Sequence, residues 1–384
     1  MDQFKTIRSV ISVAFVALCV LHLASQRPLW LDETYVLRNI EGLGYAELFG
    51  PLKPAQSFPR VYLVIVKWLG SFCDNHVVAL RLLSFVFMIG AYFVWKDLYR
   101  RHCKGEPGEM TILLLSWLAS YWLVYYAAEL KPYSMDVLAA GLFMLFFLKQ
   151  REYTAQVPSS GMYLGAILLP GLLFFSYTAI FFFWIVCYNF LQLSMRNRKL
   201  IPVFLLSSAA SLACFALFYW TDVRHSITTA GVDYWESYFL CTKSAGCFFE
   251  SFGEGIKRYT VFWWSNVKEV RRFAVGLIPV FLYGLVRFGY AGLKADKLRV
   301  FSLDGLAAVL FLQFFILGLL HKYPFTGQRI TLFFAPVVFY LITRTLSATR
   351  EVKYLGKALH IYYIGYCYVT LLVSVWTYIG LYRA

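Results

Sequence analysis

Charged residues are scarce in this 384-residue sequence, where Asp, Glu, Lys and Arg make up only 15% of the chain. A soluble chain carries about 25% charged residues and roughly 45–50% apolar ones. Here 60% of the residues are apolar and the mean hydropathy is +0.61, which excludes an ordinary soluble domain. Several runs of roughly 20 apolar residues are long enough to cross a bilayer. These spans must be helices, because lipid cannot satisfy unpaired backbone groups.

Several functional motifs are also missing. No Cys/His spacing is typical of a zinc site, and no glycine-rich loop is typical of phosphate binding. No internal repeat, low-complexity tract or Gly/Ser linker divides the chain, so we expect residues 1–384 to form one transmembrane domain. The net charge of +15 comes from short basic clusters at the ends of apolar runs. Because these clusters do not form one basic patch, nucleic-acid binding is not expected.

The apolar runs predict an all-α polytopic membrane protein with about eleven transmembrane helices. The first run, residues 10–24, follows Lys5 and Arg8 like a signal peptide, but it lacks a convincing cleavage site and is interpreted as a retained span. The other ten spans are expected at residues 81–99, 109–128, 133–149, 161–176, 178–195, 201–220, 273–290, 300–320, 329–346 and 358–380.

Short basic clusters predict the orientation of these spans. When all eleven are counted, four clusters fall on the same side of the membrane, at residues 100–104, 196–199, 287–299 and 344–357. The positive-inside rule makes that side cytoplasmic, with the N-terminus inside and the C-terminus outside.

The outer side then holds two long segments, residues 26–80 and 221–272, which we expect to form the active-site face. Residues 61–72 are apolar but too short for a comfortable span, and they predict an amphipathic helix in the outer interface. Cys241 and Cys247 both fall in the second segment, and they either form a local disulfide, if that face is oxidising, or stay reduced.

Polar residues gather in three clusters at the outer ends of the spans. The first contains the adjacent carboxylates Asp32 and Glu33, and the second contains Glu129, Lys131 and Tyr133. The third covers residues 321–329. Each also fits an ordinary structural role, such as a helix cap at Asp32 or an interfacial anchor at Lys131.

Asp136 is harder to explain structurally, because it lies about one turn into a span, where an ionisable group is a functional candidate. The span count brings all three clusters to the same face. Carboxylates there could accept a proton from an acceptor, and cations could stabilise a departing lipid phosphate.

The sequence resembles the GT-C membrane glycosyltransferases, and most of all the bacterial relatives of the protein O-mannosyltransferases and lipid A aminoarabinose transferases (glycosyltransferase family 39-like). The motifs behind this resemblance are WLDETY at residues 30–35, QSFPRVYL at 56–63, ALRLLS at 79–84, YYAAELKPY at 125–133 and YPFTGQR at 323–329. The middle of the chain matches only in hydropathy. Larger family members carry a further soluble domain, so acceptor recognition is expected to rest here on the membrane core and residues 221–272.

The resemblance implies an inverting glycosyltransferase (EC 2.4 class) that takes its sugar from a polyprenyl-phosphate-linked donor. It implies a bacterial inner (cytoplasmic) membrane, an active site on the periplasmic face and a role in cell-envelope glycans. Asp32 would be the general base, and Glu33 would orient the acceptor or bind the sugar. The acceptor is a hydroxyl of a lipid, a glycan or a protein, among which the sequence does not choose.

The remaining roles follow from the same resemblance. Lys131 and Arg329 would bind the donor phosphate, with Arg38, Arg60 and Arg81 in reserve. Contacts to the sugar or acceptor are expected from Tyr35, Glu129, Tyr133, Asp136 and Gln328. No cofactor is expected; a divalent metal on Asp32 and Glu33 is not favoured, because other oxygen ligands are not evident.

Two other classes of protein fit the same clusters. A flippase or transporter of polyprenyl-linked sugars would also need an apolar groove, phosphate-binding cations and buried carboxylates, and it would favour inverted repeats and interrupted helices. A membrane scaffold would treat the clusters as ordinary loops, with Asp32, Lys131 and Arg329 far apart in space.

Overall fold

The computed structural model describes residues 2–52, 56–72, 76–103, 107–152, 159–224, 234–296, 302–350 and 352–383. Within them the regular secondary structure is helical throughout. Parts of both long segments expected on the outer face, residues 53–55, 73–75 and 225–233, lie outside the described residues.

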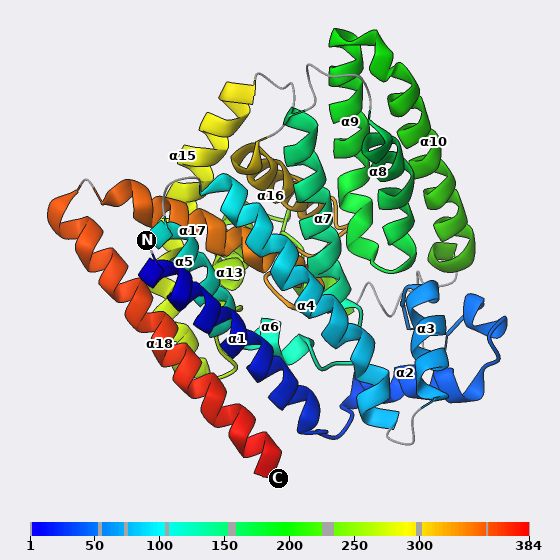
Figure 1. Ribbon diagram of the computed structural model, residues 1–384, viewed down its shortest axis with the longest axis horizontal. Coiled ribbons are helices and arrows are strands. Elements are labelled where there is room, and N and C mark those ends of the chain that lie inside the picture. Colours follow the sequence, from blue (N-terminus) through cyan, green and yellow to red (C-terminus); the bar gives the residue numbers. More distant parts are fainter. Residues whose placement is uncertain are drawn as a thin grey trace.

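The helices follow the apolar runs of the sequence (Figure 1). The α-helices are α1 (Asp2–Ala24), α2 (Leu31–Gly42), α3 (Arg60–Gly70), α4 (His76–His102), α5 (Pro107–Ala119), α6 (Tyr121–Tyr126), α7 (Tyr133–Glu152), α8 (Ser160–Gly171), α9 (Ile180–Arg196), α10 (Ile201–Phe218), α13 (Ala245–Val261), α14 (Lys268–Phe273), α15 (Ile278–Asp296), α16 (Leu303–Leu319), α17 (Ala335–Thr349) and α18 (Lys353–Arg383). The 3₁₀ segments are η1 (Glu47–Phe49), η2 (Leu172–Phe174), η3 (Tyr177–Ala179), η4 (Arg198–Leu200), η6 (Glu236–Tyr238), η7 (Ala274–Leu277) and η8 (Arg329–Phe334), and η5 (Tyr219–Val223) is a π-helix.

Eight helical segments of the described chain are long and apolar enough to cross a membrane. They are residues 3–24, 77–102, 133–150, 177–196, 198–223, 268–294, 329–349 and 354–380. Two shorter apolar helices, Ser160–Phe174 and Leu303–Leu319, join them. This is the architecture of an all-α polytopic membrane protein. Helices occupy each of the eleven predicted ranges, but the number of crossings stays a prediction.

The predicted span at residues 109–128 is divided at Ser120, whose extended backbone (ψ 103°) separates α5 from α6. The polar groups at this break find hydrogen-bond partners in the residues that follow α13. The Ser120 hydroxyl donates to the carbonyl oxygen of Trp263 at 2.8 Å, and the Tyr121 N–H donates to that of Trp264 at 3.2 Å. Within a membrane span, a backbone interruption is tolerated where another part of the protein supplies the missing partners.

The bundle has a closed centre and a strongly apolar outside. In the candidate span that contains α17, 83% of the 18 most apolar consecutive residues are buried. In the span that contains α10, only 22% are buried. Outer helices expose large apolar side chains such as Leu212, Ile361 and Trp376. Figure 1 shows α1 and α18 side by side and running in the same direction along one edge, with α8, α9 and α10 on the other side. The exposed apolar surface fits a lipid environment.

The segment after α1 forms a small structure of its own at one end of the bundle. Helices α2 and α3 lie there, beside the start of α4 (Figure 1). Val36 and Ile40 of α2 pack with Tyr62 and Val66 of α3 in a second buried cluster, while Trp68 on the other face of α3 is half exposed. An amphipathic helix was expected at residues 61–72, and α3 occupies residues 60–70.

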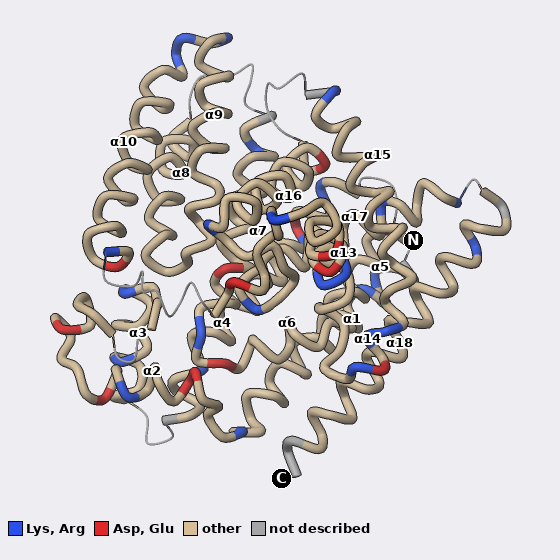
Figure 2. Tube along the Cα trace, turned by 180° about the vertical axis from the view of Figure 1, so that it is seen from behind, with Lys and Arg blue, Asp and Glu red and all other residues tan. Residues whose placement is uncertain are grey.

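Charged residues are distributed unevenly over the fold. Figure 2 shows the shafts of α8, α9 and α10 without Lys, Arg, Asp or Glu, and charged residues at the ends of α9 and α10. It also shows acidic and basic residues close together around α2, α4 and α6. The next section describes this second group.

Candidate active site

The side chains of Asp32 and Arg329 form an ion pair although the two residues are far apart in the sequence. The Arg329 Nη1 lies 2.9 Å from the Asp32 Oδ2, and the two side chains are 20% and 22% exposed. The Arg329 guanidinium also lies over the ring of Trp30, 4.9 Å from its centroid. The first and third sequence clusters therefore share a partly open pair of opposite charges.

The loop before Arg329 is held against α13 by close backbone contacts. Gly327 sits so near to α13 that a Cβ there would clash with the carbonyl oxygen of Arg258. Phe325 fits between Gly255 of α13 and Gly318 of α16, where a Cβ would lie 2.5 and 2.7 Å from its side chain. These glycines let the loop approach closely, and so they fix where Arg329 begins η8.

Lys131, from the second cluster, is buried within range of the charges of this pair. Its Nζ donates to the Gln56 Oε1 at 3.0 Å and lies 5.5 Å from the centre of the Phe58 ring. Burial lowers the pKa of Lys131, while the negative charges of Asp32 and Glu129 oppose that shift. The three clusters are thus near enough for their charges to act on one another.

Glu33 is fully buried and saturated with protein partners. Arg81 binds it through Nε to Oε1 at 2.9 Å and through Nη2 to Oε2 at 2.7 Å, and the Arg27 Nη1 lies 3.0 Å from Oε2. The Leu130 N–H donates to Oε1 at 2.7 Å. Burial alone would raise the pKa of Glu33, but the hydrogen bonds and charge of Arg81 hold it below its usual value.

These contacts give Glu33 a positioning role, and its contact with the sugar or acceptor stays a prediction. The residue ties α2, α4 and the loop before Lys131 together, one position from Asp32. Arg81 also donates to the carbonyl oxygens of Arg27 at 2.8 Å and Pro28 at 3.4 Å. Each nitrogen of Arg81 thus donates within the protein, and its role as a phosphate ligand stays a prediction.

Arg38 and Tyr35 lie together on α2. Arg38 is exposed, with its guanidinium 5.8 Å from the centre of the half-buried Tyr35 ring. Gln328 takes part in the start of η8, where its N–H donates to the Thr331 hydroxyl at 3.0 Å. These three residues therefore interact mainly with their own segments.

Glu129 is buried without a hydrogen-bond partner on either carboxyl oxygen among the described residues. Its Oε2 lies 3.8 Å from the Arg27 Nη2. Burial, together with the negative charge of Glu33, raises the pKa of Glu129 to about 8. Both carboxyl oxygens of Glu129 could therefore still accept a hydrogen bond, which is unusual for a buried polar group.

Tyr133 and Asp136 are buried at the start of α7. Tyr133 packs edge-on against Tyr126 with ring centres 5.0 Å apart. Asp136 accepts a hydrogen bond from the Ser176 hydroxyl at 2.5 Å, which links α7 to the turn before η3. The intramembrane carboxyl therefore has a structural partner in the loop between α8 and α9.

A further buried ion pair was not expected from the sequence. The Arg60 Nη2 lies 3.1 Å from the Asp222 Oδ1, and the Tyr177 hydroxyl also donates to Asp222. In the described part of the chain the Arg60 Nε and Nη1 have no hydrogen-bond partner. Arg60 was expected only as a reserve phosphate ligand. The sequence signal for Asp222 was an acidic residue at the end of the apolar run 201–220.

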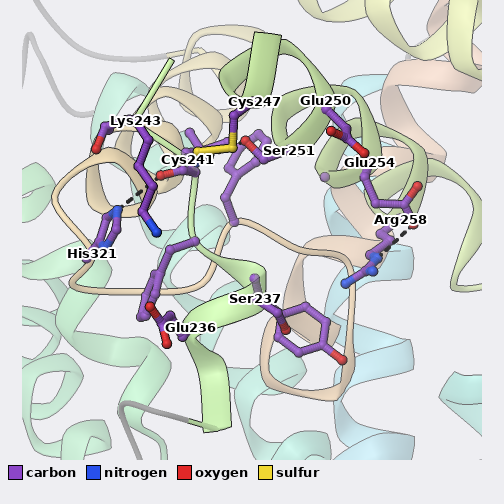
Figure 3. A pocket seen from close by; sticks show the side chains of 16 residues that line it. Glu236, Ser237, Cys241, Lys243, Cys247, Glu250, Ser251, Glu254, Arg258 and His321 are labelled. Atoms are coloured by element: carbon purple, nitrogen blue, oxygen red, sulfur yellow. Dashed lines mark hydrogen bonds and ion pairs between the residues drawn. A yellow bond between two sulfur atoms is a disulfide. The ribbon is translucent and has the colours of Figure 1, made fainter. Parts of the chain in front are cut away.

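The Cys241–Cys247 disulfide is present, with Cα atoms 5.6 Å apart. It borders a cavity of about 370 Å³ that is lined by η6, α13 and the loop before η8, as Figure 3 shows. His321 also lines the cavity and contacts the carbonyl oxygen of Leu240, the residue before Cys241, at 3.0 Å. Within the described residues no group of three or more His, Cys, Asp or Glu side chains is arranged to hold a metal ion.

No protein-family model, curated protein or solved structure matches this chain.

Proposed function

We propose that this membrane protein is an inverting glycosyltransferase that moves a sugar from a polyprenyl-phosphate-linked donor to an acceptor hydroxyl. The observation that supports it is the ion pair of Asp32 with Arg329, whose charges act on the buried amine of Lys131. A scaffold of unrelated loops would give no reason for Asp32 to pair with Arg329 while the charge of Lys131 is in range of both. A transferase of this kind can use a carboxylate as the base and cations to stabilise the leaving phosphate.

In the proposed reaction, the acceptor oxygen attacks the anomeric carbon as its proton passes to the carboxylate of Asp32. The bond between the anomeric carbon and the phosphate oxygen breaks, and its electron pair stays on the leaving polyprenyl phosphate. Attack from the opposite side inverts the anomeric carbon. Lys131 and Arg329 stabilise the charge of the leaving phosphate.

Arg329 has two roles in this proposal: it pairs with Asp32 and it binds the donor phosphate. Without donor, its guanidinium neutralises Asp32 at 2.9 Å. An arginine has five N–H donors in a planar fork, so it can bind a phosphate oxygen with the donors that Asp32 does not use. Donor binding would thereby draw positive charge from Asp32 toward the phosphate and make the carboxylate a better proton acceptor.

The finer architecture is part of the same proposal. We propose eleven crossings in a GT-C arrangement, in a bacterial inner membrane, with Asp32 on the periplasmic face. The parallel direction of α1 and α18 supports an odd number of crossings (Figure 1). The disulfide supports an oxidising environment for the segment that contains it.

The test separates donor binding from transfer. Purified protein would be assayed with polyprenyl-phosphate-linked sugars for transfer, and with polyprenyl phosphate for binding. Asp32→Asn should reduce transfer by a factor of about 10² or more while binding is retained. Lys131→Ala and Arg329→Ala should weaken both. Asp97→Asn, in a surface pair with Arg100 and Arg101, is the matched control. Unchanged transfer by Asp32→Asn would reject Asp32 as the base.

A further inference from the structure

The Cys241–Cys247 disulfide fastens a short segment, residues 238–241, to α13. Cys241 is the last residue of this segment, and Cys247 lies in the first turn of the helix. The Cys241 N–H also donates to the hydroxyl of Ser251, one turn further along α13, at 3.0 Å. Segment 238–241 is therefore attached to α13 at two neighbouring points, and one of them is covalent.

The loop before η8 is bound to the same short segment. The Phe325 N–H donates to the carbonyl oxygen of Tyr238 at 2.9 Å, and the His321 imidazole contacts the carbonyl oxygen of Leu240 at 3.0 Å. The rings of Phe239 and His321 stack with centres 5.2 Å apart. Each of these contacts joins one residue of the segment to one residue of the loop, so a shift of the segment acts directly on the loop.

The loop transmits such a shift to Arg329. Phe325 and Thr326 are buried, and Gly327 packs against the backbone of Arg258. Arg329 follows only two residues later, where η8 begins, and pairs with Asp32 at 2.9 Å. Close-packed interiors transmit small displacements instead of absorbing them. A continuous set of contacts therefore runs from the disulfide through segment 238–241 and the loop to the Asp32–Arg329 pair.

The disulfide is open to a reductant from the cavity beside it. Both cysteines line this cavity of about 370 Å³, and both are only half-buried. Figure 3 shows the bridge among the polar side chains of the lining. Accessible disulfides are the ones that exchange readily with thiols, whereas enclosed ones resist reduction. The covalent attachment of segment 238–241 can therefore be broken in the folded protein.

A dithiol reduces the bridge in two steps. Its thiolate attacks one sulfur of the bridge, the S–S bond breaks, and its electron pair leaves on the other cysteine sulfur, which takes up a proton. The second thiolate of the reductant then displaces the first cysteine sulfur, which is protonated in turn. The protein gains two electrons and two protons, and the dithiol becomes a disulfide.

We propose that the Cys241–Cys247 disulfide positions Arg329, so that polyprenyl phosphate binds the oxidised protein more tightly than the reduced protein. This inference rests on the proposed function for the role of Arg329 as a phosphate ligand, whereas the coupling of the disulfide to the loop does not. Reduction leaves the hydrogen bond from Cys241 to Ser251 in place. We therefore expect affinity to fall about fivefold, at the low end of the usual coupling between two sites.

The test is a redox titration of the full-length protein in phosphatidylcholine nanodiscs, with buffers of reduced and oxidised dithiothreitol. Polyprenyl phosphate binding and alkylation of Cys241 and Cys247 are measured at each buffer ratio. The loss of affinity should follow the appearance of the two thiols. Coupling is reciprocal, so saturating polyprenyl phosphate should make the bridge harder to reduce by the same factor. A disulfide with a merely structural role would show no such shift, and that result would overturn the proposal.

Two double variants separate this bridge from the other cysteines. Cys241→Ser/Cys247→Ser should bind polyprenyl phosphate like the reduced wild type and ignore the buffer ratio. The matched control, Cys187→Ser/Cys214→Ser, replaces two half-buried free cysteines and should keep the full response. A response that persists in the first variant, or disappears in the control, would assign the effect to other cysteines and overturn the proposal.

Hydrogen exchange of residues 321–328 tests the coupling without any donor. Reduction should speed exchange in this loop, because local openings become more frequent when an attachment is lost. Unchanged exchange with the bridge fully reduced would overturn the positioning role. If the oxidised wild type fails to bind polyprenyl phosphate, the proposed donor site and the effect on affinity are both rejected. The exchange data then show separately whether the disulfide holds the loop.

Discussion

Arg81 and Glu33 form a two-point ion pair, at 2.9 and 2.7 Å, between side chains that are both fully buried. The pair joins the start of α4 to the start of α2. Through Leu130 it also fixes the loop that presents Lys131. The catalytic group we propose, Asp32, is therefore placed by its neighbour in sequence.

Glu33→Gln should destabilise the protein strongly. The substitution leaves Arg81 and Arg27 buried without their counter-charge, and breaking a buried pair costs about 3–5 kcal/mol. The free energy of unfolding, measured by thermal or chemical unfolding in detergent, gives the result. Asp97→Asn, which disrupts partly exposed pairs, should cost less than about 1 kcal/mol. A similar small effect for both variants would show that the Glu33 network contributes little.

Glu129 should make the protein less stable as the pH rises. Its folded pKa is raised to about 8, above the value of about 4.3 in an unfolded chain. Its contribution is therefore full below about pH 4.3 and is lost as the pH rises toward 8, at up to about 1.4 kcal/mol per pH unit.

The measurement is the unfolding midpoint of wild type and Glu129→Gln between about pH 6 and pH 9. Glutamine cannot ionise, so the variant should show a flatter profile than wild type over this range. Parallel profiles for the two proteins would mean that Glu129 does not titrate there.

Gly327→Ala should weaken polyprenyl phosphate binding without removing any charged atom. A methyl group at this position clashes with the backbone of Arg258, so the loop must move and carry Arg329 with it. Gly253→Ala is the matched control on α13, because a Cβ there meets nothing within 4 Å. We expect Gly327→Ala to bind polyprenyl phosphate about tenfold more weakly, because a displaced Arg329 loses charge-assisted contacts with the phosphate. Equal binding by the two variants would show that the position of this loop does not determine the affinity for the donor.

Removal of the disulfide should loosen the rim of the neighbouring cavity. Cys241→Ser/Cys247→Ser is expected to lower the free energy of unfolding by about 2 kcal/mol, the low end of the usual range, because the closed loop is short. Unfolding is followed with and without a reducing agent. Wild type should respond to the reductant and the double variant should not. A double variant that still responds would show that another cysteine pair is involved.

The apolar runs were enough to place the helices, since helices occupy every range predicted from hydropathy. The site was only partly predictable. Glu33 recurs with Val36 and Ile40 on one face of α2, and that spacing would have assigned it to the buried side while Asp32 faces outward. The Arg60–Asp222 pair joins two distant segments. No local pattern could have predicted that contact.

The interruption at Ser120 has a consequence for how the chain is made. The Tyr121 N–H and the Ser120 hydroxyl donate to the carbonyl oxygens of Trp264 and Trp263. These donors of α5 and α6 therefore lack their partners until the ribosome has synthesised the residues that follow α13. We therefore expect the region around α6 to complete its packing late during biogenesis.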